Sequence, residues 1–312
     1  MEEKMYLSFD IGGTNIKFGV VNEKGQILEK AKVPTPKEEV EFLSLLTKIT
    51  DDFKARYSLD GIGISAPGVV SSDGVMTTFG ALQSMYGLPL REKLSGLTQL
   101  PVVVENDANA AAIAEHWVGG AKDLQNYITA VIGTGIGGGI VLNGQVYHGG
   151  HGLAGELGWP LYHHVPKAGN IEVASETFHS ATVLGLLQKY NQVLDTYGTH
   201  EPFTDPVLLI ERVKAGDADA TAVWNSFVSD LATNLLNLFA IFDPDAIIVG
   251  GGISENSYFM SALTNEWTTL IGRHQALNRV NQMGLLGTIR KAELGNDAGL
   301  LGAAFTIKEK LK

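Results

Sequence analysis

The chain has 312 residues, of which 45% are hydrophobic and 18% charged, which is enough apolar material for the cores of about two domains. Its formal net charge of −11 and sequence pI of about 5.2 argue against a nucleic-acid partner, since proteins that bind nucleic acid are usually basic. The absence of cysteine excludes disulfides and thiolate zinc sites, and no apolar run is long enough for a membrane span, so we expect a cytoplasmic enzyme.

The first motif is a glycine-rich turn between two strands. A strand predicted for residues 6–9 ends at Asp10, the turn Ile-Gly-Gly-Thr-Asn follows, and residues 16–21 and 26–34 continue as strands. This strand–turn–strand unit is neither a Walker P-loop nor a Rossmann turn. Its glycines would let backbone N–H groups approach a phosphate, and the Thr14 hydroxyl could add a donor. An ordinary hairpin is the alternative, although a hairpin does not need the carboxylate of Asp10.

The second motif is a polar turn between a buried strand and an alanine-rich helix. The strand covers residues 102–104, the turn is Glu105-Asn106-Asp107, and the helix begins at Ala108. Ligands collect at the carboxyl ends of strands in open α/β sheets. We therefore predict that Asp107 is the general base of a phosphoryl transfer and that Asn106 holds the acceptor. Taken alone, the stretch is better explained by simple helix capping by one of the two residues, and the motifs that follow have to favour catalysis over it.

The strand–turn–strand pattern then recurs, which indicates a weak internal repeat of two similar half-domains. A strand over residues 127–132 leads into a second turn with Gly133, Thr134 and Gly135, and residues 140–142 and 145–148 continue as strands. Two such turns facing one cleft would hold a polyphosphate from both sides. Four histidines lie nearby at positions 148, 151, 163 and 164, but their spacing matches no metal motif, and solvated histidines are the simpler interpretation.

The remaining pattern predicts a long helix over residues 175–192, further helices over 206–215 and 217–242, and a buried strand over 246–249. The glycines 250–252 after that strand offer a flat backbone surface on which a planar base could lie. A tight turn explains the same glycines. Near the C-terminus, Gly295-Asn-Asp297 opens a helix with small residues on one side, which permits close packing against a neighbour.

Taken together and in this order, these motifs resemble the ROK family (repressor, open reading frame, kinase) of bacterial sugar kinases over nearly the whole chain. The resemblance implies a two-domain α/β, actin-like (ribonuclease-H-like) ATPase fold with an interdomain cleft. The small domain would comprise residues 1–117 and the C-terminal helix 297–312, and the large domain residues 118–296. It also implies a homodimer that acts on a small sugar, without nucleic-acid or membrane partners.

The resemblance further implies ATP with Mg²⁺ as donor, a sugar hydroxyl as acceptor and Asp107 as catalytic base. Asp10 would lie near the metal, acting through water or ATP. The residues expected at the sugar are Gly68, Asn106, Glu156, Trp159 and Glu172. The residues expected at the nucleotide are Asp10, Gly12, Gly13, Thr14, Lys17, Thr134, Gly135, Gly251 and Gly252.

Three departures from the family pattern refine this expectation. Trp159 replaces a common histidine and the downstream cysteines are missing, so we expect no structural zinc, with packing of Trp159 as one substitute for it. Gly80-Ala81 replaces a sugar-binding segment and leaves room for a larger acceptor. Asp10 lies too near the start for a preceding DNA-binding region. These features resemble the β-glucoside kinases, which phosphorylate the 6-hydroxyl of cellobiose and similar glucosides. Glucokinase, fructokinase, N-acetylmannosamine kinase and a non-catalytic sugar sensor remain alternatives.

Overall fold

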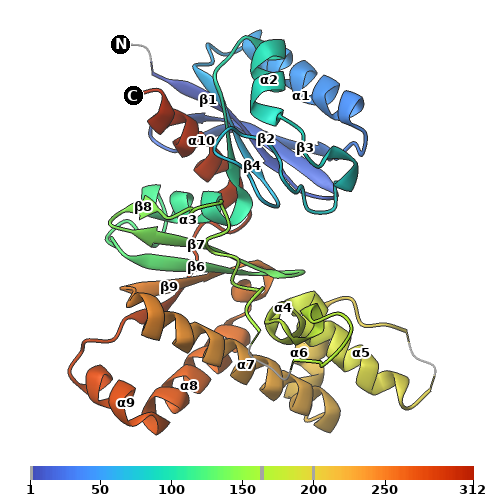
Figure 1. Ribbon diagram of the computed structural model, residues 1–312, viewed down its shortest axis with the longest axis vertical. Coiled ribbons are helices and arrows are strands. Elements are labelled where there is room, and N and C mark those ends of the chain that lie inside the picture. The colour runs from blue at the N-terminus through green and yellow to red at the C-terminus, as the bar shows by residue number, and fades with distance from the viewer. Residues whose placement is uncertain (1–2, 162–164, 199–200) are drawn as a thin grey trace. The chain divides into compact units, whose positions relative to one another are not determined.

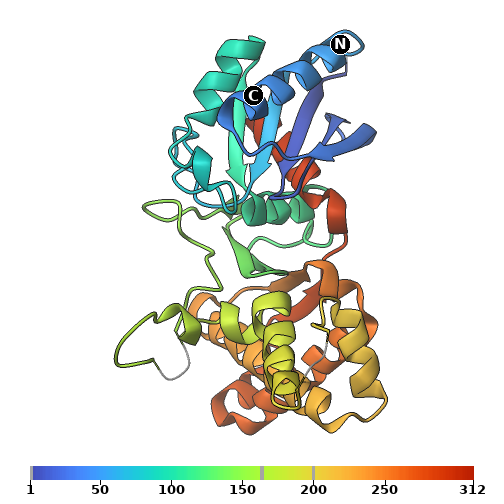
Figure 2. The same ribbon diagram turned by 90° about the vertical axis from the view of Figure 1, so that its right-hand side faces the viewer.

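The computed structural model describes residues 3–161, 165–198 and 201–312. The chain forms two compact units (Figure 1). The first consists of Met1–Leu124, Gly139–Gly155 and Glu293–Lys312, and the second of Gln125–Gly138 and Glu156–Ala292. Both termini therefore belong to the first unit (Figure 2). These units differ from the expected boundaries, 1–117 with 297–312 and 118–296, chiefly because the segment 139–155 packs with the N-terminal part of the chain.

The first unit contains a five-stranded mixed sheet in the order β3-β2-β1-β4-β5. The first three strands form the expected antiparallel meander, and β4 and β5 extend it in parallel with β1. The strands are β1 (Met5–Ile11), β2 (Asn15–Asn22), β3 (Ile27–Pro34), β4 (Gly61–Ala66) and β5 (Val102–Asn106). The helices are α1 (Glu39–Lys54), α2 (Leu90–Thr98), α3 (Asp107–Trp117) and α10 (Ala298–Lys310).

Helices cover both faces of this sheet because side chains alternate along each strand. On β1, Leu7, Phe9 and Ile11 are buried in the core that α1 and α2 complete. Tyr6 belongs to the opposite core, which α3 and α10 complete. Since Asp10 is four residues from Tyr6, its side chain lies on the α10 face of the sheet.

Helix α10 packs unusually close to its neighbours, as the small residues in its sequence predicted. A β-carbon added to Gly302 would lie 1.9 Å from the carbonyl oxygen of Ala110 on α3. A β-carbon on Gly63 of β4 would lie 2.0 Å from the carbonyl oxygen of Ala303. Neither site has room for a side chain, so glycine is required there by packing rather than by backbone conformation.

A buried carboxylate ties together two distant segments of the first unit. Glu115 on α3, only 1% exposed, accepts the backbone N–H of Gly120 at 2.7 Å. Its other oxygen accepts the N–H groups of Glu293 and Leu294 at 2.9 and 3.0 Å. The chain first leaves this unit after Leu124, returns to it for Gly139–Gly155, and re-enters it finally at Glu293. Glu115 therefore fixes the two ends of the segment between them.

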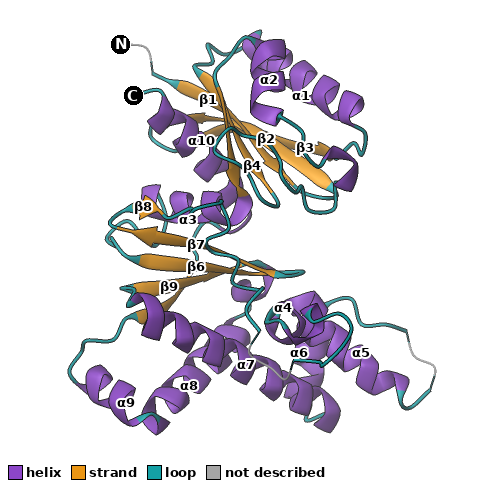
Figure 3. Ribbon diagram, in the orientation of Figure 1, coloured by secondary structure: helices purple, strands orange, loops and turns teal. Residues whose placement is uncertain are grey.

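The second sheet has the strand order β10-β9-β6-β7-β8. Helices α4 to α9 lie on one side of β6 and β9 (Figure 3). Strand β7 passes from the second unit into the first after Gly138, and β8 belongs to the first unit. The strands are β6 (Tyr127–Ile132), β7 (Ile136–Leu142), β8 (Gln145–Val146), β9 (Ala246–Gly250) and β10 (Thr288–Lys291). The helices are α4 (Thr177–Ser180), η3 (Thr182–Leu187), α5 (Gln188–Asp195), α6 (Pro206–Lys214), α7 (Ala218–Phe242), α8 (Ser257–Arg273) and α9 (Gln275–Gln282).

The single helix predicted for residues 175–192 was wrong. The structure instead has the short helix α4, a break at Ala181 with an extended ψ of 153°, a π-helical turn (η3) and then α5. The break frees the N–H groups of Thr182, Val183 and Leu184 from the helix, and they donate to the carbonyls of Gly133 and Thr134. These non-local bonds override the local helical pattern.

Within the described ranges, no helix is long and apolar enough to cross a membrane.

Candidate active site

The strand register of the first unit places three polar side chains in one row. Asp10 on β1 pairs with Ser65 on β4, and Ser65 pairs with Glu105 on β5. Because the three strands are parallel, all three residues lie at the carboxyl edge of the sheet. The Ser65 hydroxyl donates to Oδ1 of Asp10 at 3.1 Å. Asp10 is thus two strand spacings, or about 9–10 Å, from Glu105, and Asp107 follows two residues later.

The carboxylate of Asp10 is mostly shielded from solvent, and its negative charge has favourable partners on several sides. Its side chain is 18% exposed, and Oδ2 accepts a hydrogen bond from Nζ of Lys17 at 3.1 Å. Lys17 also donates to the carbonyl of Asn296 at 3.3 Å. A β-carbon on Gly299 would lie 2.4 Å from Oδ1 of Asp10, so the first turn of α10 begins against the carboxylate, where a helix N-terminus favours negative charge. Lys17, expected at the nucleotide, is here the partner of Asp10.

The first glycine-rich turn has its carbonyls held from one side. The Thr35 hydroxyl donates to the carbonyl of Gly12 at 2.7 Å, and Nζ of Lys37 donates to that of Gly13. The peptide bonds are trans, so each N–H points opposite to the carbonyl of the same peptide. The N–H groups of Gly13 and Thr14 are therefore directed away from Thr35 and Lys37, and backbone N–H groups of this kind are donors that suit an anion.

The second glycine-rich turn, in the second unit, is built in the same way. The carbonyl of Gly133 accepts the N–H groups of Thr182 and Val183 at 3.0 and 3.3 Å, and that of Thr134 accepts the N–H of Leu184 at 3.3 Å. The N–H groups of Thr134 and Gly135 consequently point away from the start of η3. Two turns at matching places in the two sheets thus present paired N–H groups, although different elements hold their carbonyls.

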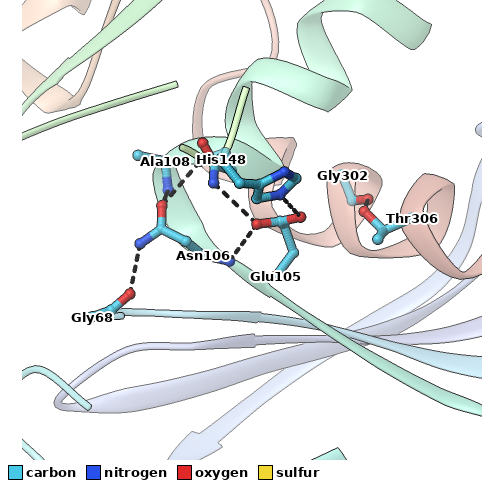
Figure 4. A network of polar contacts seen from close by, with 8 residues as sticks. Gly68, Glu105, Asn106, Ala108, His148, Gly302 and Thr306 are labelled. Carbon is cyan, nitrogen blue, oxygen red and sulfur yellow. Dashed lines mark hydrogen bonds and ion pairs between the residues drawn. The ribbon is translucent and has the colours of Figure 1, made fainter. Parts of the chain in front are cut away.

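The turn between β5 and α3 resolves the two interpretations of Asn106 (Figure 4). Its Oδ1 accepts the N–H groups of Ala108 and Asn109 at 2.9 and 3.1 Å, so Asn106 is the N-cap of α3. Its Nδ2 donates to the carbonyl of Gly68 at 2.9 Å, which leaves one N–H of that amide for a ligand. Asp107, the first helical residue, is exposed, and its Oδ1 also lies 2.8 Å from the N–H of Ala108.

Glu105 carries a second network behind this turn. Its Oε1 accepts the backbone N–H of Asn106 at 2.9 Å and the side-chain amide of Asn109 at 3.1 Å. Its Oε2 lies 2.9 Å from Nε2 of His148. Figure 4 marks this contact with a dashed line. The hydrogen bond that Glu105 accepts from the imidazole raises the pKa of His148, and partial burial opposes this effect. His148 is therefore not a simply solvated histidine.

Metal binding by the histidines finds no support in the part of the chain that the structure describes. Across these residues, no three His, Cys, Asp or Glu side chains are grouped as a metal site requires. His163 and His164 lie outside the described residues.

The two glycines after β9, Gly251 and Gly252, differ in how strictly the fold requires glycine. Gly251 has a φ of 89°, and a β-carbon there would lie 2.2 Å from the carbonyl oxygen of Ile132. A β-carbon on the exposed Gly252 would meet nothing within 4 Å. The fold therefore demands Gly251, whereas Gly252 leaves an open surface that packing alone does not explain.

The segment with Glu156, Trp159 and Glu172 is held by its backbone. The N–H groups of Glu176 and Thr177 donate to the carbonyls of Pro160 and Gly158 at 3.0 and 2.9 Å. Trp159 is 58% exposed, so the expectation that its packing fixes this segment was wrong. Burial raises the pKa of Glu156, while Glu172 is exposed.

Sequence reasoning missed several residues around these groups. Thr35 and Lys37 lie between β3 and α1, Ser65 ends a strand that seemed purely structural, and Glu105 received no role. A signal was available for Ser65 and Glu105, because each is a polar residue at the carboxyl end of a parallel strand. Nothing local in the sequence connects His148 to Glu105, 43 residues away.

Comparison with known proteins adds independent information. The ROK family model matches residues 6–310. A β-glucoside kinase from Klebsiella pneumoniae is 33% identical over 300 residues, which cover 96% of this chain and 94% of the relative. A glucokinase from Halalkalibacterium halodurans is 30% identical over 329 residues and covers 99% and 97%. The structure of a ROK family glucokinase from Streptomyces griseus in complex with glucose and AMPPNP superposes with a TM-score of 0.75 at 26% identity, covering 99% of this chain and 100% of that chain. The expected actin-like α/β fold is confirmed.

Proposed function

Because the chain belongs to the ROK family and is a sugar kinase, we propose that it transfers the γ-phosphate of ATP to the 6-hydroxyl of a β-glucoside such as cellobiose, with Asp107 as general base. One observation carries the assignment of the base. Asn106 caps α3 and is tied to Gly68, so the exposed carboxylate of Asp107 has a fixed place at the carboxyl edge of the first sheet.

The main task proposed for Asp107 is to orient the acceptor hydroxyl. Phosphoryl transfer has a loose transition state, in which positioning and charge stabilisation dominate. An ionised carboxylate at a helix N-terminus is stabilised by about 0.3–1 kcal/mol. Asp107 would therefore act mainly by orienting the acceptor hydroxyl and accepting its proton late. Capping and catalysis do not compete, since Asn106 supplies the cap.

On the donor side, the residues present fit Mg²⁺ and a polyphosphate. Mg²⁺ is commonly held by one or two carboxylates, waters and substrate phosphates, and Asp10 offers one carboxylate at the strand edge. The bound ion would neutralise charge on the transferred phosphoryl group. The outward N–H groups of Gly13, Thr14, Thr134 and Gly135 would bind phosphate oxygens, with Gly12 shaping the first turn. The open surface at Gly252, which the turn at Gly251 presents, would receive the adenosine.

On the acceptor side, we assign Gly68, Asn106, Glu156, Trp159 and Glu172 to the sugar. Asn106 has one amide N–H left for a hydroxyl, and Glu156 is shielded enough for its hydrogen bonds to be strong. The name of the β-glucoside kinase relative and the small residues Gly80 and Ala81 favour a glucoside over a bare hexose. The glucokinase relative keeps glucose as the second candidate acceptor.

A sugar screen tests the acceptor. Purified protein with MgATP would be given cellobiose, other β-glucosides, glucose, fructose and N-acetylmannosamine, with ADP release as the readout and NMR to locate the new phosphate. We expect the highest kcat/KM for a β-glucoside, phosphorylated at its 6-hydroxyl. A higher kcat/KM for glucose would overturn the acceptor assignment. Saturable sugar binding without ADP release from any sugar would favour the non-catalytic sensor.

Asp107→Asn tests the base. The amide retains the shape of the side chain but cannot accept the proton, so kcat should fall at least about a hundredfold while sugar binding, measured by calorimetry, persists. A variant that turns over at a near-normal rate would refute the assignment.

We also propose a cytoplasmic homodimer without structural zinc. The family resemblance supports the dimer, and the lack of cysteine supports the zinc-free state. Light scattering of the purified protein gives the oligomeric state, and elemental analysis gives the zinc content.

A further inference from the structure

We propose that Glu105 and His148 are a pair of positioning residues that hold the Asp107 turn in place through a hydrogen bond from a separate loop. The inference rests on the proposed role of Asp107 as base. It concerns two residues that touch neither the nucleotide nor the sugar in the assignments above.

The first argument is the way in which Glu105 surrounds Asp107. Glu105 is 8% exposed, and its Oε1 binds the backbone N–H of Asn106 and the side chain of Asn109. These two partners stand on either side of Asp107 in the sequence. Any rotation of the Glu105 carboxylate would therefore move the cap residue and the first turn of α3 together, and Asp107 with them.

The second argument is that Glu105 needs His148. A buried carboxylate is stable only if each oxygen has a donor. Asn106 and Asn109 satisfy Oε1, and His148 is the donor at Oε2, 2.9 Å away. His148 stands in the loop after β8, which packs against α3. Without the imidazole, the carboxylate would turn toward water and pull on the capping turn.

The third argument is electrostatic. The titratable residues on the elements packed around the imidazole are Glu105 on β5, Asp107, Glu115 and His116 on α3, and Tyr147 and His151 on its own loop. Among the described residues, the one charged group that shifts the pKa of His148 is Glu105, which raises it. The charged pair is therefore complete below the ordinary histidine pKa of about 6.5 and is lost as pH rises through the raised pKa. A neutral imidazole can still donate from Nε2, but more weakly.

The test compares three histidine variants. His148→Ala removes the donor of a hydrogen bond to a charged group beside the Asp107 turn, so kcat should fall at least about tenfold. KM for ATP should stay within about twofold of wild type, because the lost bond does not involve the residues assigned to the nucleotide. His148→Gln keeps an N–H donor at a similar reach and should restore kcat to within about threefold of wild type. His151→Ala, an exposed histidine on the same loop, is the matched control and should change nothing.

The pH profile separates positioning from simple structural support. In the wild type, kcat should decline as pH rises through the raised pKa of His148, since the charge-assisted hydrogen bond is then replaced by a weaker neutral one. His148→Gln should lack this decline. The proposal is overturned if His148→Ala keeps wild-type kcat, or if Gln is no better than Ala.

A measurement independent of turnover distinguishes failure of this inference from failure of the proposed function. The pKa of His148 can be followed by NMR of the imidazole in the sugar-free protein. We expect it above the ordinary value in the wild type and lower in Glu105→Gln, because burial, which lowers the pKa, then lacks the opposing effect of the Glu105 charge. If no sugar is phosphorylated, the proposed function fails, and an equal His148 pKa in both proteins would still refute the pair.

Discussion

The turn between β5 and α3 and the segment that carries Glu156, Trp159 and Glu172 are held in different ways. In the turn, side chains make the decisive bonds: Asn106 and Glu105 together accept or donate six hydrogen bonds. In the second segment, the described residues of 156–177, called here the acceptor loop, the anchoring bonds come from the backbone of Glu176 and Thr177. Several of its large side chains are exposed, among them Trp159 at 58% and Val173 at 50%.

This difference suggests how one reaction serves several sugars. The relatives carry different acceptor names, glucokinase and β-glucoside kinase, within one family. A loop anchored through its backbone can exchange its exposed side chains without losing its place, because the bonds to Pro160 and Gly158 do not depend on them. A turn anchored by side chains cannot. We therefore expect substitutions in the turn to affect turnover and substitutions in the acceptor loop to affect KM for the sugar.

The largest effect is expected for Asn106→Ala. Losing the N-cap should cost about 1–2 kcal/mol of unfolding free energy, and misplacing Asp107 should lower kcat about a hundredfold. Asn106→Ser is the matched control, because serine can cap the helix but cannot reach Gly68 with an N–H. Urea unfolding and steady-state kinetics separate the two losses. An Ala variant with normal kcat would show that the cap does not position Asp107.

The next largest effect concerns the acceptor-loop anchor and depends on pH. Burial raises the pKa of Glu176 to about 7, with Ser180 opposing the shift. The folded state thus holds a proton that the unfolded state releases above pH 4.5, so stability falls as pH rises from 4.5 to about 7. Glu176→Gln removes this penalty and should stabilise the protein by about 3 kcal/mol at pH 8 and hardly at pH 4.5. Equal gains at both pH values would contradict the raised pKa.

These examples also show which features a sequence reveals. The sequence placed Asp10, the glycine turns and the Glu105–Asp107 stretch at strand ends and turns, because strand ends, turns and caps have local sequence signatures. The break at Ala181 was not predictable in this way, because the N–H groups of Thr182 to Leu184 donate to the carbonyls of Gly133 and Thr134, which lie far upstream in the sequence. The pairing of His148 with Glu105 and the exposure of Trp159 are likewise set by tertiary contacts. A role for Asp107 could be proposed from sequence, but the contact between Glu105 and His148 behind its turn could not.

A smaller effect is expected for Gly158→Ala in the acceptor loop. The new β-carbon would lie 2.2 Å from Oγ1 of Thr177 and 2.8 Å from the carbonyl oxygen of Ile136. Overpacking of this kind costs about 1–3 kcal/mol, and the displaced loop should raise KM for the sugar with little change in kcat. Gly272→Ala on α8, where a β-carbon meets nothing within 4 Å, is the control and should not destabilise the protein. A fall in kcat with unchanged KM would contradict the expectation that substitutions in the loop affect KM and substitutions in the turn affect kcat.

The smallest effect on stability is expected for Trp159→Ala, and it tests the comparison most directly. Because 58% of this residue is exposed and the loop is anchored by backbone bonds, unfolding free energy should change by less than about 0.5 kcal/mol. KM for cellobiose should nevertheless rise, and more than KM for glucose, if the indole lies against the second sugar ring. Thermal unfolding and kinetics with both sugars give the two answers. A strongly destabilised variant would show that Trp159 supports the structure of the loop. Unchanged KM values for both sugars would show that Trp159 does not contact the acceptor.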